Sequence, residues 1–202
     1  MILYNKDMKG GVAMDNISIL DRSPEVRAAF IEKFTLSWEE LQSEHKQWID
    51  DLAENNHPVS YNDILLWDKM PKYQSVSFAD ALSLLKSLSG DVFFMSENET
   101  YPYCRGIKVD GKEYKGGVAR MNAVALAGLI EYEWYEDWRL SAENMYLENT
   151  VLPEDLYVFD LSMEHMIVFT HENDFWGSEF EQPMEAAASR VCMMYGFDGI
   201  SV

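Results

Sequence analysis

Residues 156–170 read LYVFDLSMEHMIVFT, a stretch with the features of two strands joined by a turn. Its two ends, 156–159 and 166–170, are rich in β-branched and aromatic side chains, which favour extended backbone. A polar turn around Asp160-Leu161-Ser162 separates them. We therefore expect 156–159 to pair antiparallel with 166–170 as a β-hairpin.

Other segments add to the predicted sheet. Asp110-Gly111, between 107–109 and 112–114, is a strong two-residue hairpin signal because both positions tolerate a positive φ. The apolar run at 92–95 is typical of a buried strand. Because these strands are joined by hairpins, the predicted sheet is mainly antiparallel.

Several amphipathic helices are predicted: helices come first along the chain, and strands, a helix, further strands and a last helix follow. The clearest is 38–54, which begins with the capping box Ser37-Trp38-Glu39-Glu40 and then repeats apolar residues every three or four positions. A helical turn is favoured within 61–69. The remaining predicted helices are 24–35, a segment from Ser77 to Gly90, 122–147 with a break near Ser141, and 183–194. This element order predicts the α+β class.

The length of 202 residues fits one domain, which we expect to span 14–202. Back-translation of Lys9 to Met14 can give a purine-rich ribosome-binding site followed by a start codon, so 1–13 are interpreted as a mis-assigned or loose N-terminal extension. A secretory signal, an apolar run of roughly 20 residues and a cysteine framework are all lacking in the sequence. These features predict a cytoplasmic protein.

The net charge of the chain limits the kinds of partner that it can bind. The chain has 16 Lys and Arg against 35 Asp and Glu, a formal net charge of −19. Such a field repels nucleic acid and anionic membranes, and it attracts basic proteins. In other acidic proteins a comparable net charge only keeps the protein soluble, so that interpretation stays open.

Motifs for nucleotide or metal chemistry are lacking in the sequence. Lys115-Gly116-Gly117 has neither the spacing of a phosphate-binding loop nor a downstream Gly-Lys-Ser/Thr. His165 and His171 would lie on one face of a strand but about 20 Å apart, too far to share a metal unless the strand ends before Thr170. We expect no cofactor and no metal.

Acid–base chemistry has four candidate residues. Glu133 and Asp137 are four residues apart on the long predicted helix, where buried carboxylates would share a proton and exposed ones would only border the core. His171 and Glu172 stand where a strand runs into an acidic loop, and Glu172 could orient His171 as a base. These residues define an enzyme hypothesis.

The same helix offers a binding hypothesis. Glu131, Tyr135 and Glu136 belong to a segment in which four carboxylates alternate with tyrosine and tryptophan. Carboxylates and aromatic faces both attract Lys and Arg side chains. We expect these three residues to contact a basic protein partner.

The segment Leu152-Pro153-Glu154-Asp155-Leu156-Tyr157-Val158-Phe159-Asp160, followed by Met166-Ile167-Val168-Phe169-Thr170-His171-Glu172, resembles a motif in small uncharacterised bacterial proteins. Some of these are similar to immunity proteins carried with polymorphic toxins. The resemblance covers some twenty residues and implies an acidic cytosolic protein that occludes the active site of a toxin domain. Two function classes therefore remain open: an immunity-like binding protein without catalytic activity, and a small enzyme that uses Glu133, Asp137 and His171.

Overall fold

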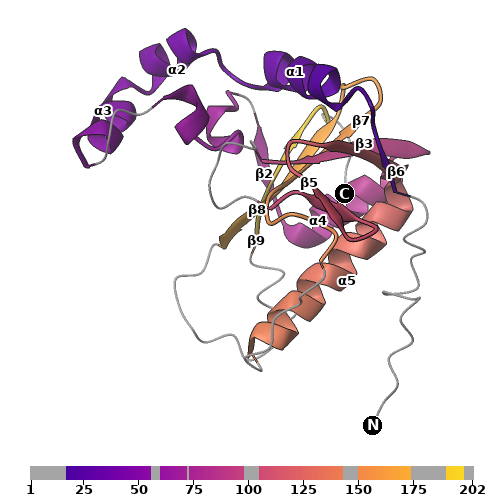
Figure 1. Ribbon diagram of the computed structural model, residues 1–202. Coiled ribbons are helices and arrows are strands. Elements are labelled where there is room, and N and C mark those ends of the chain that lie inside the picture. Colours follow the sequence, from indigo (N-terminus) through magenta and orange to yellow (C-terminus); the bar gives the residue numbers. More distant parts are fainter. Residues whose placement is uncertain are drawn as a thin grey trace.

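The computed structural model describes residues 17–55, 60–71, 73–97, 105–142, 150–173 and 190–197. The proposed extension 1–13 lies outside them. A seven-stranded antiparallel sheet, in the order β1-β6-β3-β7-β8-β9-β2, forms the centre of the structure (Figure 1). Its strands are β1 (Ser18–Ile19), β2 (Gln74–Val76), β3 (Asp91–Ser96), β6 (Val118–Asn122), β7 (Leu156–Asp160), β8 (Met166–Asn173) and β9 (Arg190–Tyr195).

Both predicted hairpins are confirmed. β7 and β8 pair antiparallel, with Leu156 opposite Phe169. The hairpin at Asp110-Gly111 joins β4 (Ile107–Val109) to β5 (Lys112–Tyr114), and both turn residues have a positive φ. It forms a separate two-stranded sheet beside the main one.

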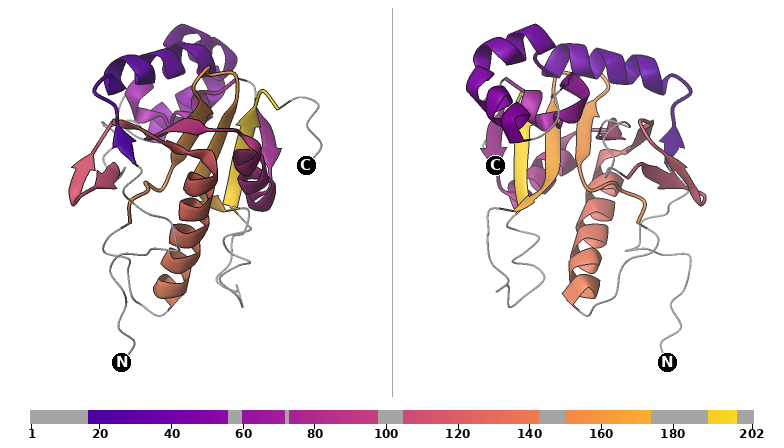
Figure 2. Two further views of the ribbon diagram at one scale, coloured as in Figure 1. Left: turned by 90° about the vertical axis from the view of Figure 1, so that its right-hand side faces the viewer. Right: turned by 60° about the vertical axis from the view of Figure 1, so that its left-hand side comes forward.

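Helices cover both faces of the main sheet, which establishes the predicted α+β class (Figure 2). On one face, α4 and α5 pack on Val158 and Phe169; on the other, α1 packs on Tyr157 and Val168. Successive strand residues point to opposite faces, so each strand supplies both cores. The helices are α1 (Ser23–Phe34), α2 (Trp38–Glu44), α3 (Lys46–Asn55), α4 (Phe78–Ser87) and α5 (Ala123–Ala142).

The predicted helix 38–54 is divided into two. Its capping box is present, with the Ser37 hydroxyl accepting from the Glu40 amide and the Glu40 carboxylate accepting from the Ser37 amide. At His45 the backbone leaves the helical region, with φ −122° and ψ 31°, so α2 ends and α3 begins. Leu41 of α2 and Ile49 of α3 pack into the same small apolar cluster. Residues 61–69 form two 3-10 turns, η2 (Tyr61–Asp63) and η3 (Trp67–Lys69).

The prediction of a helix over 183–194 is wrong for residues 190–194, which belong to β9; residues 183–189 lie outside the described part. β9 pairs with β8 on one side and β2 on the other. Cys192 contributes to the core under α4 and α5, whereas Met193 contributes to the core under α1. This alternation has the period of a strand.

Gly196 ends β9 with a φ of +86°, and a Cβ at this position would lie 2.0 Å from the Glu164 carbonyl oxygen. The strand end therefore requires glycine. No helix in the described part of the chain is long and apolar enough to span a membrane.

Candidate functional site

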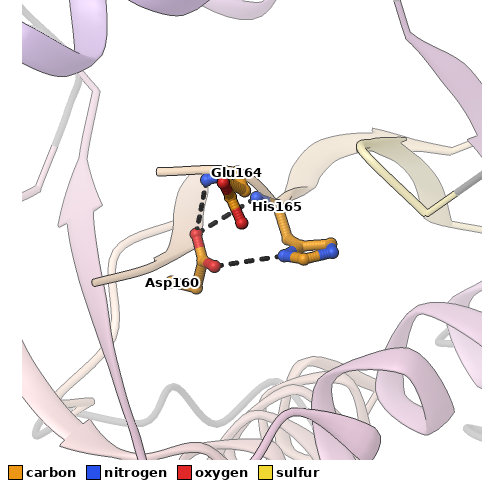
Figure 3. A group of neighbouring side chains, drawn as sticks. All are labelled: Asp160, Glu164 and His165. Atoms are coloured by element: carbon orange, nitrogen blue, oxygen red, sulfur yellow. Dashed lines mark hydrogen bonds and ion pairs between the residues drawn. The ribbon is translucent and has the colours of Figure 1, made fainter. Parts of the chain in front are cut away.

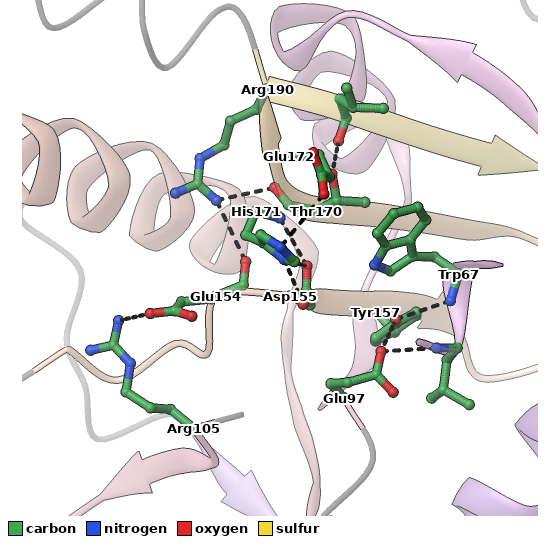
Figure 4. Close-up of polar contacts among 12 residues, drawn as sticks. Trp67, Glu97, Arg105, Glu154, Asp155, Tyr157, Thr170, His171, Glu172 and Arg190 are labelled. Atoms are coloured by element: carbon green, nitrogen blue, oxygen red, sulfur yellow. Dashed lines mark hydrogen bonds and ion pairs between the residues drawn. The ribbon is translucent and has the colours of Figure 1, made fainter. Parts of the chain in front are cut away.

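The start of β7 and the end of β8 bring together Asp155 and His171. The Asp155 carboxylate accepts a hydrogen bond from the His171 amide at 2.8 Å and lies 3.0 Å from the ring Nδ1 (Figure 4). Asp155, which the sequence analysis did not single out, therefore orients the imidazole. Glu172, the predicted partner, lies 3.7 Å from Nε2.

The two carboxylates favour the charged form of the ring. The hydrogen bond with Asp155 raises the pKa of His171, against the opposing effect of burial, and the charges of Asp155, Glu172 and Glu154 add to the rise. Asp155 is buried, whereas 43% of the His171 side chain is exposed. An imidazole placed between two carboxylates keeps its proton to higher pH, which makes it a better ion-pair partner than a general base.

A second group of hydrogen bonds joins the side chains of Glu97 and Tyr157 to backbone amides at the start of η3. The Glu97 carboxylate, just after β3, accepts hydrogen bonds from the Leu66 amide at 3.0 Å and from the Tyr157 hydroxyl. The Tyr157 oxygen in turn accepts from the Trp67 amide at 3.2 Å. These bonds attach the start of η3 to β3 and β7 (Figure 4), and Asp68 is the next residue of η3 after Trp67.

Asp68 has an unfavourable environment for a negative charge. Burial and the carboxylates of Glu97, Glu172 and Asp155 raise its pKa from 3.8 to about 6, although Lys69 opposes the rise. Within the described part of the chain, Asp68 accepts no hydrogen bond and forms no ion pair. We call Asp68, Glu97, Asp155 and Glu172 the carboxylate cluster.

Lys69 is a fully buried cation beside this cluster. Its Nζ lies 3.9 Å from the centre of the Tyr61 ring and donates no hydrogen bond. Burial lowers the pKa of Lys69 to about 8, and the attraction of Glu97 limits the fall. Lys69 thus interacts with an aromatic face and with Glu97, and it compensates Asp68 only in part.

A groove of about 620 Å³ is lined by residues of η3, among them Asp68, and by residues of the α2–α3 break. We call it the acidic groove; its lining residues are Glu44, His45, Trp48, Trp67, Asp68, Met70, Pro71 and Tyr73. A second groove of about 580 Å³, lined by Tyr73, Gln74, Glu164 and residues 194–197, follows the edge of β2 and β9. Neither groove is lined by Glu133 or His171.

Glu133 has a structural position. It is almost completely buried on α5, and its two carboxylate oxygens accept hydrogen bonds from the Val151 and Leu152 amides at 2.7 and 2.8 Å. It therefore attaches the segment before β7 to α5, and the expectation that it would border the core in contact with water is wrong. The Asp137 side chain lies outside the described residues, so the predicted pairing with Glu133 stays a prediction.

One of the three predicted partner-binding residues can be placed. Glu131 is exposed on α5, and its carboxylate lies 3.3 Å from Lys86 of α4. The side chains of Tyr135 and Glu136 lie outside the described residues. The helix face at Glu131 is thus accessible, with a lysine beside it.

The turn between β7 and β8 gathers Asp160, Glu164 and His165, whose ligand atoms lie within 4.8 Å of one another (Figure 3). The Asp160 carboxylate is already occupied: it accepts from the Glu164 and His165 amides and from the Ser162 hydroxyl, and it lies 3.1 Å from His165 Nδ1. These bonds close the turn, which accounts for the cluster without a metal. β8 continues past Thr170, so the condition under which His165 and His171 could share an ion is not met.

The fold defines an α+β protein with a seven-stranded antiparallel sheet, and the site adds a carboxylate cluster next to an acidic groove. Comparison with known proteins gives no match: no family model, no curated protein and no solved structure is significantly similar to the chain.

Proposed function

We propose that this chain is a binding protein without catalytic activity whose partner is a basic protein, in the manner of an immunity protein that occludes a toxin domain. The observation that carries the proposal is the carboxylate cluster, in which Asp68 is partly buried beside three other carboxylates and no cation from the described residues pairs with the Asp68 carboxylate. A basic partner would supply that cation. The net charge of −19 would speed its approach.

Asp155, His171 and Glu172 lie in the segment that resembles small uncharacterised bacterial proteins, some of which are similar to immunity proteins. The raised pKa of His171 fits an ion-paired network on a binding surface. Toxin domains that act on nucleic acid are typically basic, since they bind phosphates. We therefore expect a partner of that kind.

Capture experiments test the proposal. The immobilised chain is exposed to lysate at about 0.03 M and about 0.3 M salt, between which the screening length falls from nearly 20 Å to about 6 Å. Proteins of positive net charge should dominate the set retained at low salt, and their association rates should fall steeply at high salt. Retention of a set with no excess of basic proteins would refute the proposal.

The predicted face on α5 is tested separately with an identified partner. Replacing Glu131 and Glu136 by Lys should slow association, whereas truncating Tyr135 should speed dissociation. Glu32→Lys, at an exposed carboxylate of α1 that lines neither groove, is the control with the same charge change per site. If both sets of variants associate at the same rate, α5 is not the contact face.

The hydrogen bond between Asp155 and His171 favours a second candidate function, an enzyme that uses His171 for acid–base chemistry. Such a mechanism requires a neutral imidazole at the working pH for base catalysis, or proton donation from Nε2 for acid catalysis. If His171→Gln abolishes a catalytic activity of the chain and leaves the partner-binding affinity unchanged, the enzyme function would be established in place of the binding function.

A further inference from the structure

The acidic groove has two walls of different origin. Glu44, His45 and Trp48 come from the α2–α3 break, and Trp67 and Asp68 come from η3. Trp48 is 38% exposed and Tyr73, which also lines the groove, is 47% exposed. Large aromatic side chains are thus presented to solvent next to two carboxylates.

The two carboxylates of the groove differ in what surrounds them. Glu44 is exposed to solvent, whereas Asp68 is partly buried and receives no donor from the described residues. The other charged or titratable groups near Asp68 are Lys69, which is buried against Tyr61, and the carboxylates of the cluster, with His45 on the opposite wall. A buried carboxylate without a donor is costly, and a cation that enters the groove removes that cost.

We propose that the acidic groove binds an arginine side chain of the basic partner; this inference rests on the proposed function and assigns it a contact site. The guanidinium group donates in a fork that fits a carboxylate such as Asp68, and its planar face stacks on indole rings such as those of Trp48 and Trp67. Lysine offers a point charge that is more strongly hydrated and stacks less well. A metal ion would need more oxygen ligands than the two carboxylates of the groove supply.

The probe for this inference is N-acetyl-arginine methylamide, added to the intact chain while the indole N–H resonances of the tryptophans are followed by NMR. The arginine probe should shift the Trp48 and Trp67 signals saturably. The citrulline analogue, which has the same shape without the charge, should give no saturable shift, and the lysine analogue should bind several-fold more weakly.

Two variants decide whether Asp68 is responsible. Asp68→Asn should weaken binding of the arginine probe at least fivefold, because it removes the charge that the guanidinium pairs with. Glu32→Gln on α1 removes one negative charge outside the groove and should change the affinity less than twofold.

Different results would refute the groove inference and the proposed function. Equal binding of the arginine and citrulline probes, or an Asp68→Asn variant that binds arginine as well as the wild type, overturns the groove inference. Capture of basic proteins that is insensitive to Asp68→Asn would also overturn it and leave the proposed function in place. Absence of basic proteins from the captured set would refute the proposed function instead.

Discussion

Asp68→Asn should stabilise the protein at neutral pH. Raising the pKa of Asp68 from 3.8 to about 6 corresponds to about 3 kcal/mol of unfavourable free energy for the ionised form in the folded state. The side chain is partly exposed, so solvent screening reduces this to about 1.5 kcal/mol. For a chain of 202 residues, that gain raises the melting temperature by about 3–6 °C.

The gain should depend on pH with a definite sign. The folded-state pKa lies above the unfolded-state value, so the folded protein holds the Asp68 proton more tightly. The cost of ionising Asp68 is fully present above about pH 6 and declines as the pH falls from 6 toward 3.8. The stability gain of Asp68→Asn should therefore fall to roughly half at pH 5 compared with pH 7.5.

Urea denaturation of the wild type and the variant at pH 7.5 and pH 5 measures the stability gain and its change with pH. Both pH values lie above the isoelectric point of about 4.4. Glu32→Gln, an exposed carboxylate on α1, is the matched control and should stay within about 0.5 kcal/mol of the wild type at both pH values. A loss of stability in Asp68→Asn at pH 7.5, or a gain that does not change with pH, would refute the assignment of Asp68 as an uncompensated carboxylate.

Three further predictions concern the fold and the site. Gly196→Ala should lower the free energy of unfolding by at least about 3 kcal/mol, because its Cβ would meet the Glu164 carbonyl. Gly90→Ala, with a similar φ of +85° but open space around the position, should lower it by only about 1–2 kcal/mol, and equal losses in the two variants would contradict the steric argument. Glu133→Ala should lower the free energy of unfolding by about 2–4 kcal/mol because two buried amides lose their acceptor, and Glu133→Gln, which keeps one acceptor, should lower it less. An unchanged stability of Glu133→Ala would show that Glu133 has no structural role. Asp155→Asn should lower the pKa of His171 in an NMR titration, and an unchanged pKa would mean that another group causes the rise.

Local signals predicted the parts of the fold that local chemistry determines. The hairpin at Asp110-Gly111 needs two residues with positive φ, and the helix starts at Ser37 and Ser77 need side chains that accept backbone hydrogen bonds. Each of these requirements is satisfied within four residues of sequence. They are therefore visible without knowledge of the tertiary structure.

The failures concern segments whose state depends on distant partners. Residues 190–194 follow an alanine-rich stretch that favours helix, yet β9 is extended because β8 and β2 pair with it on both sides. β6, only five residues long, was missed because it leads directly into α5. Intrinsic propensity is too weak to predict either strand against this tertiary context.

The site was predictable in part. His171 and Glu172 were found from their place at a strand end, and Asp155 could have been found with them. The hairpin register places Asp155 one position beyond Leu156, opposite the residue before His171. Asp68 could not be found in this way, because its environment depends on Glu97 holding η3 against the sheet across 31 residues of sequence.

Glu133 and Asp68 show why burial alone does not identify a binding carboxylate. Glu133 is the more deeply buried of the two, but both of its oxygens accept amide hydrogen bonds, so its charge is stabilised within the chain. Asp68 is less buried, yet it has no donor among the described residues and lies beside other carboxylates. A charged group that destabilises the folded state and links no two parts of the fold has no structural role. Such groups are concentrated at the sites where proteins bind their partners. Asp68 is therefore the carboxylate that the described part of the chain compensates only in part, and we propose that the basic partner binds there, whereas Glu133 belongs to the structure of α5.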